Sequence, residues 1–274
     1  MLRPPSVEAI DYLIVGHIAL DITPHGLRLG GTAAYSALTA RALGQRVGLV
    51  TSWGAGEQFG LLLERGVQIL SIPAEKTTIF ENIATLHGRI QRIESIAQPL
   101  TLDVIPAEWR IAPLVHLAPI AQEIEPEIAN EFPESLVLAT VQGWLRRWDA
   151  AGHISPADWR NSLPALQKKG VIVMSEEDVQ YDEAVIAAMA AEAHHLVVTC
   201  GSSGARVFIA GEQYPIAAPS IAEVDATGAG DIFAAAYAIH YQRTQDPFEA
   251  AVFANRLAAD SVTRCGLASI PLEV

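Results

Sequence analysis

Short apolar runs that alternate with helical patterns are the feature that most constrains the fold of this chain. The runs that resemble buried strands are Tyr12–Val15, Val47–Thr51, Leu114–Leu117, Leu136–Thr140, Val171–Met174 and Leu196–Thr199. The helical patterns between them are Thr32–Leu43, Glu57–Glu64, Pro156–Gln167 and Asp182–Glu192. Strands that are apolar on both faces need helices on both sides, as in a parallel sheet with helical crossovers. The sequence therefore predicts an α/β fold with a doubly wound, mostly parallel sheet flanked by helices.

The segment Thr77–Ala97 breaks this alternation. Its residues alternate in polarity on either side of His87-Gly88, a dipeptide that can form the turn of a hairpin. Both faces of the hairpin carry charged side chains, so we expect it to project from the core. Because the chain has no internal repeat and no linker, we expect a single domain that comprises residues 1–274. A second hairpin is expected where Arg206–Ile209 and Gln213–Ile216 flank Ala210-Gly211.

The composition limits the classes of protein to consider. The chain has 274 residues, half of them hydrophobic, and a formal charge of −13 from 31 acidic and 18 basic residues. This charge disfavours a nucleic-acid partner. No apolar run approaches the roughly 18 residues of a membrane span and no signal sequence is evident, so we expect a cytoplasmic protein without membrane contact. Cys200 and Cys265 have no metal-binding spacing and are expected to be buried thiols.

The stretch Glu223–Tyr241 carries the strongest chemical signal. Gly228 and Gly230 precede Asp231 and an alanine-rich run that favours a helix. Glycines at a helix start leave backbone N–H groups uncovered, and with the helix dipole these groups make an anion site. A carboxylate beside a phosphate site is explained if it takes a proton from a hydroxyl that attacks the phosphoryl group. The alternative is an ordinary helix start with an acidic residue in its first turn.

Two other phosphate-binding motifs do not fit this chain. Phe233 stands where a dinucleotide fingerprint needs its third small residue. The lysines do not follow glycine in the spacing of a Walker loop. A phosphate would therefore be held by backbone N–H groups and by arginines. Arg146 and Arg147 follow a predicted strand end and are candidates, although this segment could equally be an exposed helix.

The sequence DATGAGDIF at Asp225–Phe233 resembles the signature of the ribokinase-like (PfkB) carbohydrate kinases. The resemblance covers nearly the whole chain, including Val15–Gly44 and Thr199–Ala205. It implies a ribokinase-like fold and an ATP-dependent transfer of phosphate, with Mg²⁺, to a hydroxyl of a small sugar or cyclic polyol. In this family a small β-lid covers the sugar, so the lid here would be formed mainly by about 77–97 and part of 17–30. Such a lid would exclude water from the reaction.

The resemblance also implies roles for individual residues. Asp231 would be the base, and the N–H groups around Gly228, Ala229 and Gly230 would stabilise charge on the transferred group. The residues implied for the acceptor are Asp21, Gly30, Gly31, Tyr35, Asn82, Arg89 and Gln142. The residues implied for the nucleotide are Ser175, Thr199, Gly201, Gly204, Thr227 and Asn255. Asp178 would hold Mg²⁺ through water, and Asp225 would help to hold a K⁺ ion.

The sequence departs from the family pattern at the acceptor site and at the motif implied for Mg²⁺ and phosphates. Tyr35 stands where the family commonly has asparagine, which argues against ribose. Ser175 and Asp178 replace the asparagine and glutamate of the N-x-x-E motif. The segments ENIATLHGRIQRI and VQGWLRRWD look most like the branch that includes inositol kinases. An inositol-like acceptor is therefore favoured.

Other interpretations stay open at this point. A non-catalytic sugar or nucleotide sensor could share the fold, although a sensor has no use for Asp231. The chain could also be a kinase for a nucleoside or another sugar. A nicotinamide-dependent dehydrogenase is disfavoured because no glycine fingerprint follows the first strand, where Gly16 precedes His17-Ile18-Ala19. The nucleotide preference, the hydroxyl that is phosphorylated and the formation of a homodimer also stay open.

Overall fold

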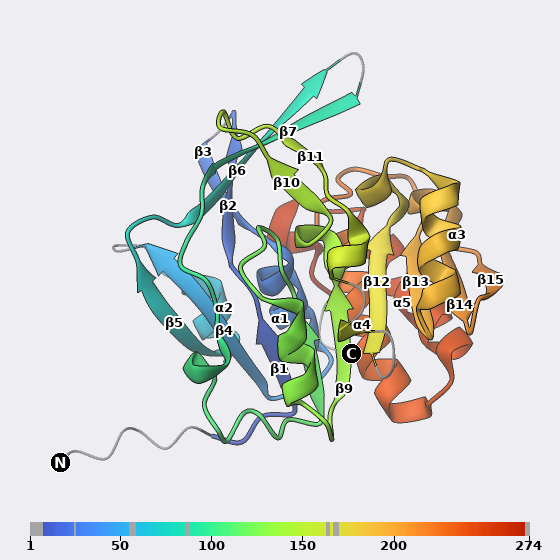
Figure 1. Ribbon diagram of the computed structural model, residues 1–274, viewed down its shortest axis with the longest axis horizontal. Coiled ribbons are helices and arrows are strands. Elements are labelled where there is room, and N and C mark those ends of the chain that lie inside the picture. Colours follow the sequence, from blue (N-terminus) through green and yellow to red (C-terminus); the bar gives the residue numbers. More distant parts are fainter. Residues whose placement is uncertain are drawn as a thin grey trace.

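A long mixed sheet forms the centre of the protein. The structure, a computed structural model, describes residues 8–24, 26–54, 59–85, 88–162, 165–166 and 170–271, with only the backbone described at 83–85 and 88–90. These residues form a nine-stranded sheet in the order β15-β14-β13-β12-β9-β8-β1-β4-β5 (Figure 1). Its strands are Tyr12–Val15 (β1), Val47–Gly54 (β4), Gln68–Ala74 (β5), Leu114–Leu117 (β8), Leu136–Thr140 (β9), Gly170–Ser175 (β12), His195–Thr199 (β13), Ala205–Ile209 (β14) and Glu212–Ile216 (β15). All neighbours from β5 to β13 are parallel, and β14 and β15 form the predicted antiparallel hairpin. The predicted fold class is confirmed.

Helices cover both faces of this sheet. The α-helices are Thr32–Ala42 (α1), Gly60–Glu64 (α2), Glu183–Glu192 (α3), Ala229–Thr244 (α4) and Pro247–Ser261 (α5). One core contains residues of α1, α2, α4 and α5, and the other contains residues of α3. The 3₁₀ turns are Leu102–Val104 (η1), Pro126–Glu131 (η2), Val141–Gly143 (η3), Trp159–Asn161 (η4), Glu176–Val179 (η6), Gly201–Ser203 (η7) and Gly266–Ser269 (η8).

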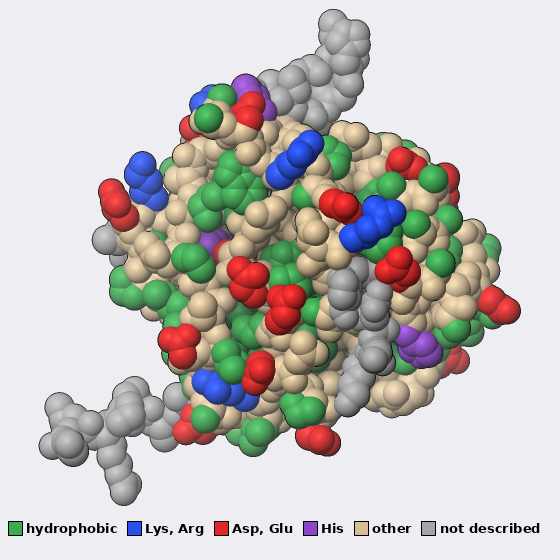
Figure 2. Space-filling view, in the orientation of Figure 1, with side chains coloured by type: hydrophobic (Ala, Val, Ile, Leu, Met, Phe, Trp, Pro, Cys, Tyr) green, Lys and Arg blue, Asp and Glu red, His purple; other side chains and the backbone are tan. Residues whose placement is uncertain are grey.

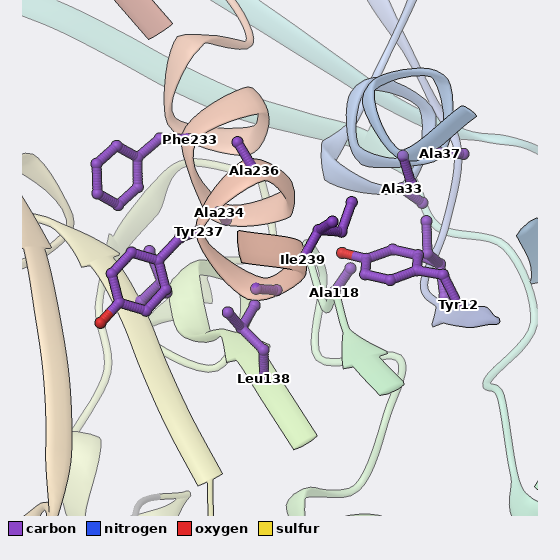
Figure 3. Close-up of a cluster of buried hydrophobic side chains, with 14 of the residues drawn as sticks. Tyr12, Ala33, Ala37, Ala118, Leu138, Phe233, Ala234, Ala236, Tyr237 and Ile239 are labelled. Atoms are coloured by element: carbon purple, nitrogen blue, oxygen red, sulfur yellow. The ribbon is translucent and has the colours of Figure 1, made fainter. Parts of the chain in front are cut away.

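The strands send alternate residues into these two cores. Tyr12 and Ile14 of β1 lie in the core with α1 and α4, whereas Leu13 and Val15 lie in the other. Figure 3 shows the first core, where small alanine side chains of α1 and α4 lie among larger ones. Small side chains let the helices lie close to each other and to the sheet. The alanine-rich run after Asp231 is therefore a buried helix as well as a good helix former.

A second, smaller sheet lies beside the carboxyl end of β1. Its strands, in the order β3-β2-β6-β7, are Gly26–Gly30, Ala19–Thr23, Thr78–Thr85 and Gly88–Ser95. Strands β6 and β7 pair antiparallel, as predicted for the hairpin, and they project beyond the main body (Figure 1). A further short pair, Arg146–Trp148 (β10) and Ile154–Pro156 (β11), lies next to β7. The strands of this sheet come from the segments that were expected to form a lid. Its role as a lid stays a prediction.

One predicted helix is wrong. In place of a helix over Pro156–Gln167, the described residues form the end of β11 and the single turn η4. The Asp158 side chain accepts a hydrogen bond from the Arg160 backbone N–H, which favours a local turn over a continuing helix. The segment with Arg146 is also not a helix, because it forms β10. The predicted helix at Glu57–Glu64 begins at Gly60 in the described residues.

The two cysteines differ in exposure. Cys200 is half-buried and Cys265 is exposed, and both are free thiols, so the expectation of two buried thiols is wrong for Cys265. On the face drawn in Figure 2, described basic side chains lie apart among more numerous acidic ones. Of the helices in the described residues, none has the length and apolar character needed to cross a membrane.

Candidate active site

A cleft of about 420 Å³ lies where the smaller sheet meets the strand ends and helix starts of the main body. Residues of β2, β6 and β7 line one part of it, and the ends of β12 and β13 line another. The start of α4 also lines the cleft. Ligands of open α/β sheets bind at such strand ends, so the topology makes this cleft the candidate site.

The first turn of α4 presents backbone N–H groups to the cleft. Gly228 is the N-cap, with a φ of 82°, and no side chain caps the helix. Gly228, Ala229, Gly230 and Asp231 all line the cleft. Because the first N–H groups of a helix have no partner within it, this turn can hold an anion such as a phosphoryl group.

Asp231 lies in this turn and is partly buried. Burial raises the pKa of its carboxyl group to about 6, and the charges of Asp178 and Asp21 add to the rise. A hydrogen bond with the Thr32 side chain and the charge of Arg146 oppose this rise in pKa. A carboxylate with a pKa near 6 is mostly ionised at neutral pH, yet it is a stronger base than an exposed aspartate.

Asp21 begins a chain of polar side chains that crosses the smaller sheet. Its Oδ1 accepts a hydrogen bond from Asn82 Nδ2 at 3.1 Å, and Asn82 Oδ1 accepts one from Gln91 Nε2 at 2.9 Å. Gln91 Oε1 then accepts a bond from Arg146 Nη2 at 3.1 Å. Gly30 makes room for the carboxylate, because a Cβ there would lie 2.4 Å from Asp21 Oδ2. These four side chains line one wall of the cleft with carboxylate, amide and guanidinium groups that can bind hydroxyls.

An apolar surface accompanies this polar chain. The Phe80 ring lines the cleft, and the Arg146 guanidinium lies 5.8 Å from its centre. Ala19 and Ile120 also line this part. A ligand with one apolar face and a rim of hydroxyls therefore finds partners for both.

Tyr35 of α1 lies against Gly228, the N-cap of α4. Its side chain lines the cleft but is only 1 % exposed, and its hydroxyl has no hydrogen-bond partner among the described residues. Burial raises the pKa of this phenol, so it stays protonated and can donate a hydrogen bond to a ligand. Gly31, the N-cap of α1 at φ 87°, lies next to Ala19, whose N would be 3.0 Å from an added Cβ.

The residues predicted to bind nucleotide come from the ends of β12 and β13, the loop around η7, the loop before α4 and helix α5. Ser175, Thr199, Gly201, Gly204, Thr227 and Asn255 all line the cleft. Gly204 has a φ of 97°, and a Cβ there would lie 2.2 Å from the Ile216 carbonyl oxygen. The Asn255 amide donates to the carbonyl oxygens of Ile216 at 3.0 Å and Ala217 at 3.4 Å. Asn255 thus holds the backbone after β15 in place at the edge of the cleft.

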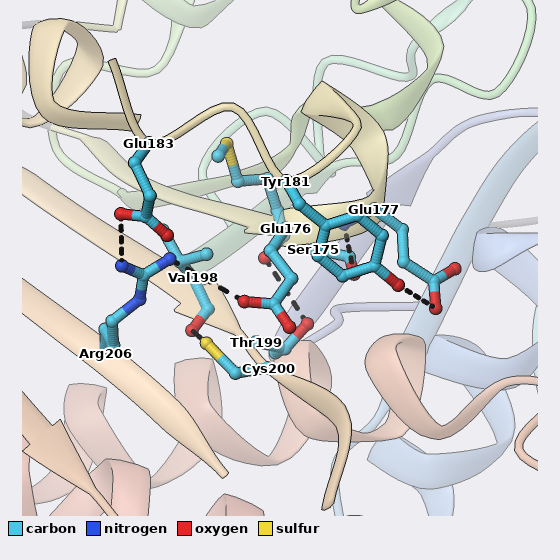
Figure 4. A network of polar contacts seen from close by, with 10 residues as sticks. Ser175, Glu176, Glu177, Tyr181, Glu183, Val198, Thr199, Cys200 and Arg206 are labelled. Atoms are coloured by element: carbon cyan, nitrogen blue, oxygen red, sulfur yellow. Dashed lines mark hydrogen bonds and ion pairs between the residues drawn. The ribbon is translucent and has the colours of Figure 1, made fainter. Parts of the chain in front are cut away.

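Asp178, the predicted Mg²⁺ ligand, does not line the cleft. Its Oδ2 accepts from the Ser175 backbone N–H at 2.8 Å, and its Oδ1 accepts from Gln142 Nε2 at 3.0 Å. The carboxylate therefore closes a capping box and orients Gln142, which does line the cleft. The neighbouring Glu177 also lines the cleft, with Oε1 accepting from Tyr181 at 3.4 Å (Figure 4).

The fit of a divalent ion can be judged from these donors. In the part of the chain that the structure describes, no three His, Cys, Asp or Glu side chains are arranged as a metal site. Mg²⁺ keeps several waters and usually takes one or two carboxylates together with substrate phosphates. Glu177 fits this requirement better than Asp178 does.

A K⁺ ion does not fit at Asp225. Its Oδ2 accepts bonds from Arg28 Nη1 at 3.3 Å and the Gly266 backbone N–H at 3.2 Å. Its Oδ1 accepts from the Thr227 backbone N–H at 2.9 Å. Donors from three segments therefore point at the carboxylate where a cation was expected.

The structure thus gathers most of the predicted residues around one cleft. Gly30 lies behind Asp21 without lining the cleft, and the side chain of Arg89 lies outside the described residues. The sequence motifs gave no indication of Arg28, Phe80, Gln91 or Glu177. Gln91 and Phe80 lie on the hairpin that was singled out, and the alternation of that hairpin could have placed them on the face of Asn82 and Asp21.

Comparisons with known proteins give two matches in sequence. Residues 170–273 match the model of the pfkB family carbohydrate kinases. A curated cytidine kinase from Thermococcus kodakarensis is 27% identical over 255 residues, which cover 85% of this chain and 89% of that protein.

Solved structures share the fold over almost the whole chain. One is a pyrophosphate-dependent kinase in the ribokinase family, complexed with a pyrophosphate analog and myo-inositol, with a TM-score of 0.75 and 20% identity. The match covers 93% of this chain and 96% of that one. Another is the Arabidopsis thaliana ribokinase complexed with ribose and ATP, with a TM-score of 0.70, 19% identity and 97% of both chains covered. The fold is therefore that of the ribokinase family.

Proposed function

From a fold shared with the ribokinase family and a C-terminal part that matches the PfkB carbohydrate kinases, we propose that this protein transfers a phosphoryl group to a hydroxyl of a small polyol. The observation that carries this proposal is the position of Asp231 in the uncapped first turn of α4. A base and an anion site share one helical turn, which is the arrangement that phosphorylation of a hydroxyl requires.

The steps assigned to the residues follow from their positions. Asp231 accepts the proton of the attacking hydroxyl, and its raised pKa makes it a competent base. The N–H groups of Ala229 and Gly230 stabilise the charge of the transferred group. Asp21 and its polar chain orient the acceptor, and the sheet of β2, β3, β6 and β7 acts as a lid that excludes water.

The proposed phosphoryl donor is ATP with Mg²⁺. Thr199, Gly201, Gly204 and Thr227 line the part of the cleft where it would bind, and Glu177 would help to hold the ion. When bound, the ion would neutralise charge on the donor phosphates. We place the reaction in the cytoplasm, in keeping with the two free thiols.

The acceptor that we favour is an inositol-like cyclic polyol. Its ring can lie on Phe80 while its hydroxyls bind the chain from Asp21 to Arg146. Tyr35 adds a buried hydroxyl that needs a partner. Buried polar groups left unpaired cost about 1–3 kcal/mol each, so such a site discriminates between hydroxyl patterns.

A nucleoside is the second candidate acceptor. The observation in its favour is the similarity to a cytidine kinase over 85% of this chain. A nucleoside also has an apolar ring face, which could lie on Phe80, and ribose hydroxyls, which could bind Asp21.

A two-way screen tests these proposals. Purified protein is assayed with ATP or pyrophosphate as donor and with inositols, pentoses, hexoses and nucleosides as acceptors, with product detected by mass. We expect phosphorylated myo-inositol, formed with kcat/KM at least about tenfold above that for ribose. A phosphorylated nucleoside as the preferred product would replace the polyol assignment and leave the transferase in place. Absence of any phosphorylated acceptor would contradict the proposed function.

A further inference from the structure

We propose that the guanidinium of Arg28 is a built-in cation at Asp225, which takes the place of a monovalent metal ion and makes the protein independent of K⁺. The contact between Arg28 and Asp225 belongs to the fold, whereas the effect of Arg28 on turnover rests on the proposed function. Arg28 would be a positioning residue, acting through Asp225 and Thr227 on the turn that holds the phosphoryl group.

The first support is the set of contacts around the Asp225 carboxylate. Arg28 Nη1 lies 3.3 Å from Asp225 Oδ2, and Arg28 Nη2 lies 3.4 Å from Thr227 Oγ1. The backbone N–H groups of Thr227 and Gly266 complete the shell. A metal ion needs oxygen atoms whose lone pairs point inward, whereas this shell presents N–H donors to the carboxylate.

The second support is the space that Arg28 fills. A Cβ built on Gly266, whose φ is 54°, would lie 3.5 Å from Arg28 Cδ and 3.7 Å from Nη1. The side chain therefore lies against the turn that begins η8, as well as against the Asp225 loop. Asp225 is 19 % exposed and Arg28 is 38 % exposed, so the pair is partly shielded from water. Its attraction is therefore stronger than that of a fully exposed ion pair.

The third support is the balance of charge in the cleft. Burial raises the pKa of the Tyr35 phenol most; the charge of Arg28 lowers it, and the charges of Asp231, Asp225 and Asp21 raise it further. A phosphoryl donor would bring further negative charge to this region. A fixed positive charge beside Asp225 compensates for part of it, as a bound monovalent cation would.

The position of Arg28 in the chain adds a mechanical consequence. Arg28 belongs to β3 of the smaller sheet, whereas Asp225 and Thr227 lead into α4. The ion pair thus joins the proposed lid to the loop that ends in the N-cap Gly228. A free metal ion could not make this connection.

The test compares the wild type with Arg28→Ala and Arg28→Lys. Thermal unfolding is measured in chloride salts of K⁺, Na⁺ and tetramethylammonium at equal ionic strength. We expect the same Tm for the wild type in all three salts. The Tm of Arg28→Ala should be about 2–4 °C higher in K⁺ than in the other two salts, and it should rise similarly when guanidinium is added. This is the size expected for a weak ligand that fills the vacated position. Arg28→Lys, which keeps the charge, should resemble the wild type.

Activity provides a second readout where an acceptor is turned over. Arg28→Ala should lose about tenfold or more in kcat/KM, and K⁺ or guanidinium should restore part of it. Arg46→Ala serves as control, because Arg46 pairs with Asp11 away from the cleft. A K⁺-specific rise in Tm or activity of the wild type would overturn the proposal. It would also be overturned if Arg28→Ala showed no response to either cation, whether or not the protein proves to be a kinase.

Discussion

The ring of Tyr35 lies against the α-carbon of Gly228, so closely that an added Cβ would be 2.2 Å from Tyr35 Cε1. This contact joins α1 to the N-cap of α4, and thereby fixes the turn that carries Asp231. Gly228 also has a φ of 82°, which only glycine adopts readily. Two independent constraints therefore require glycine at this position.

Gly228→Ala should consequently destabilise the protein, whereas Gly230→Ala should not. We expect a loss of about 1–3 kcal/mol for Gly228→Ala, because backbone strain and overpacking both contribute. Nothing lies within 4 Å of a Cβ at Gly230, so that variant should stay within about 1 kcal/mol of the wild type. Urea unfolding of both variants measures the difference, and equal stabilities would contradict this account of the contact.

Gln91 provides a test of the polar chain on the smaller sheet. Gln91→Leu removes the bonds to Asn82 and Arg146 and leaves both polar groups with one partner fewer. We expect KM for the acceptor to rise about tenfold or more, with KM for the donor nearly unchanged, because the bonds of Gln91 go to Asn82 and Arg146 on the proposed acceptor wall. Glu94→Gln, on the same strand but outside the cleft lining, is the matched control. An unchanged acceptor KM in Gln91→Leu would contradict a role for these polar side chains in binding the acceptor.

His195 gives a pH dependence of stability with a definite sign. It is buried against Tyr237, and burial lowers its pKa from 6.5 to about 4. Between these values the unfolded chain binds a proton that the folded chain does not, so stability falls as the pH drops from about 6.5 to 4. His195→Gln should make Tm less dependent on pH in this window, while His194→Gln, at an exposed neighbour, should not. Identical Tm profiles for the two variants would contradict this interpretation.

The sequence predicted the main sheet because the driving pattern is local. Runs such as Leu136–Thr140 are apolar on both faces, and only a strand between two helical layers accommodates them. The resemblance to the ribokinase-like kinases, carried by Asp225–Phe233, is confirmed by the family match and by the shared fold. The helix predicted over Pro156–Gln167 was wrong because helical periodicity does not reveal the side-chain bond at Asp158, which competes with helix formation.

Only the part of the candidate site that lies within one short motif could be predicted from the sequence. The glycines before Asp231 indicated an anion site because helix geometry alone creates one. The pairing of Arg28 with Asp225 joins residues 197 positions apart, and no local pattern indicates it. Asp178 was assigned by analogy to a metal, yet its carboxylate is used to cap η6 and to hold Gln142.

The central claim is that Asp231 is the base, and its raised pKa provides the test. Its pKa rises from 3.8 to about 6 on folding, so kcat/KM should increase with pH up to about 6 and then level off. The folded state binds this proton more tightly than the unfolded state does. Ionisation of Asp231 therefore lowers the stability of the protein as pH rises from about 4 to 6. Asp231→Asn should therefore fold at pH 8 with a Tm equal to or above that of the wild type.

The most direct measurement is the pH profile of kcat/KM for the wild type and Asp231→Asn on the same preferred acceptor. If Asp231 is the base, kcat/KM should fall by about 10²–10⁴-fold in the folded variant, and the rise near pH 6 should be lost. Turnover near that of the wild type, or an unchanged rise near pH 6 in Asp231→Asn, would contradict it.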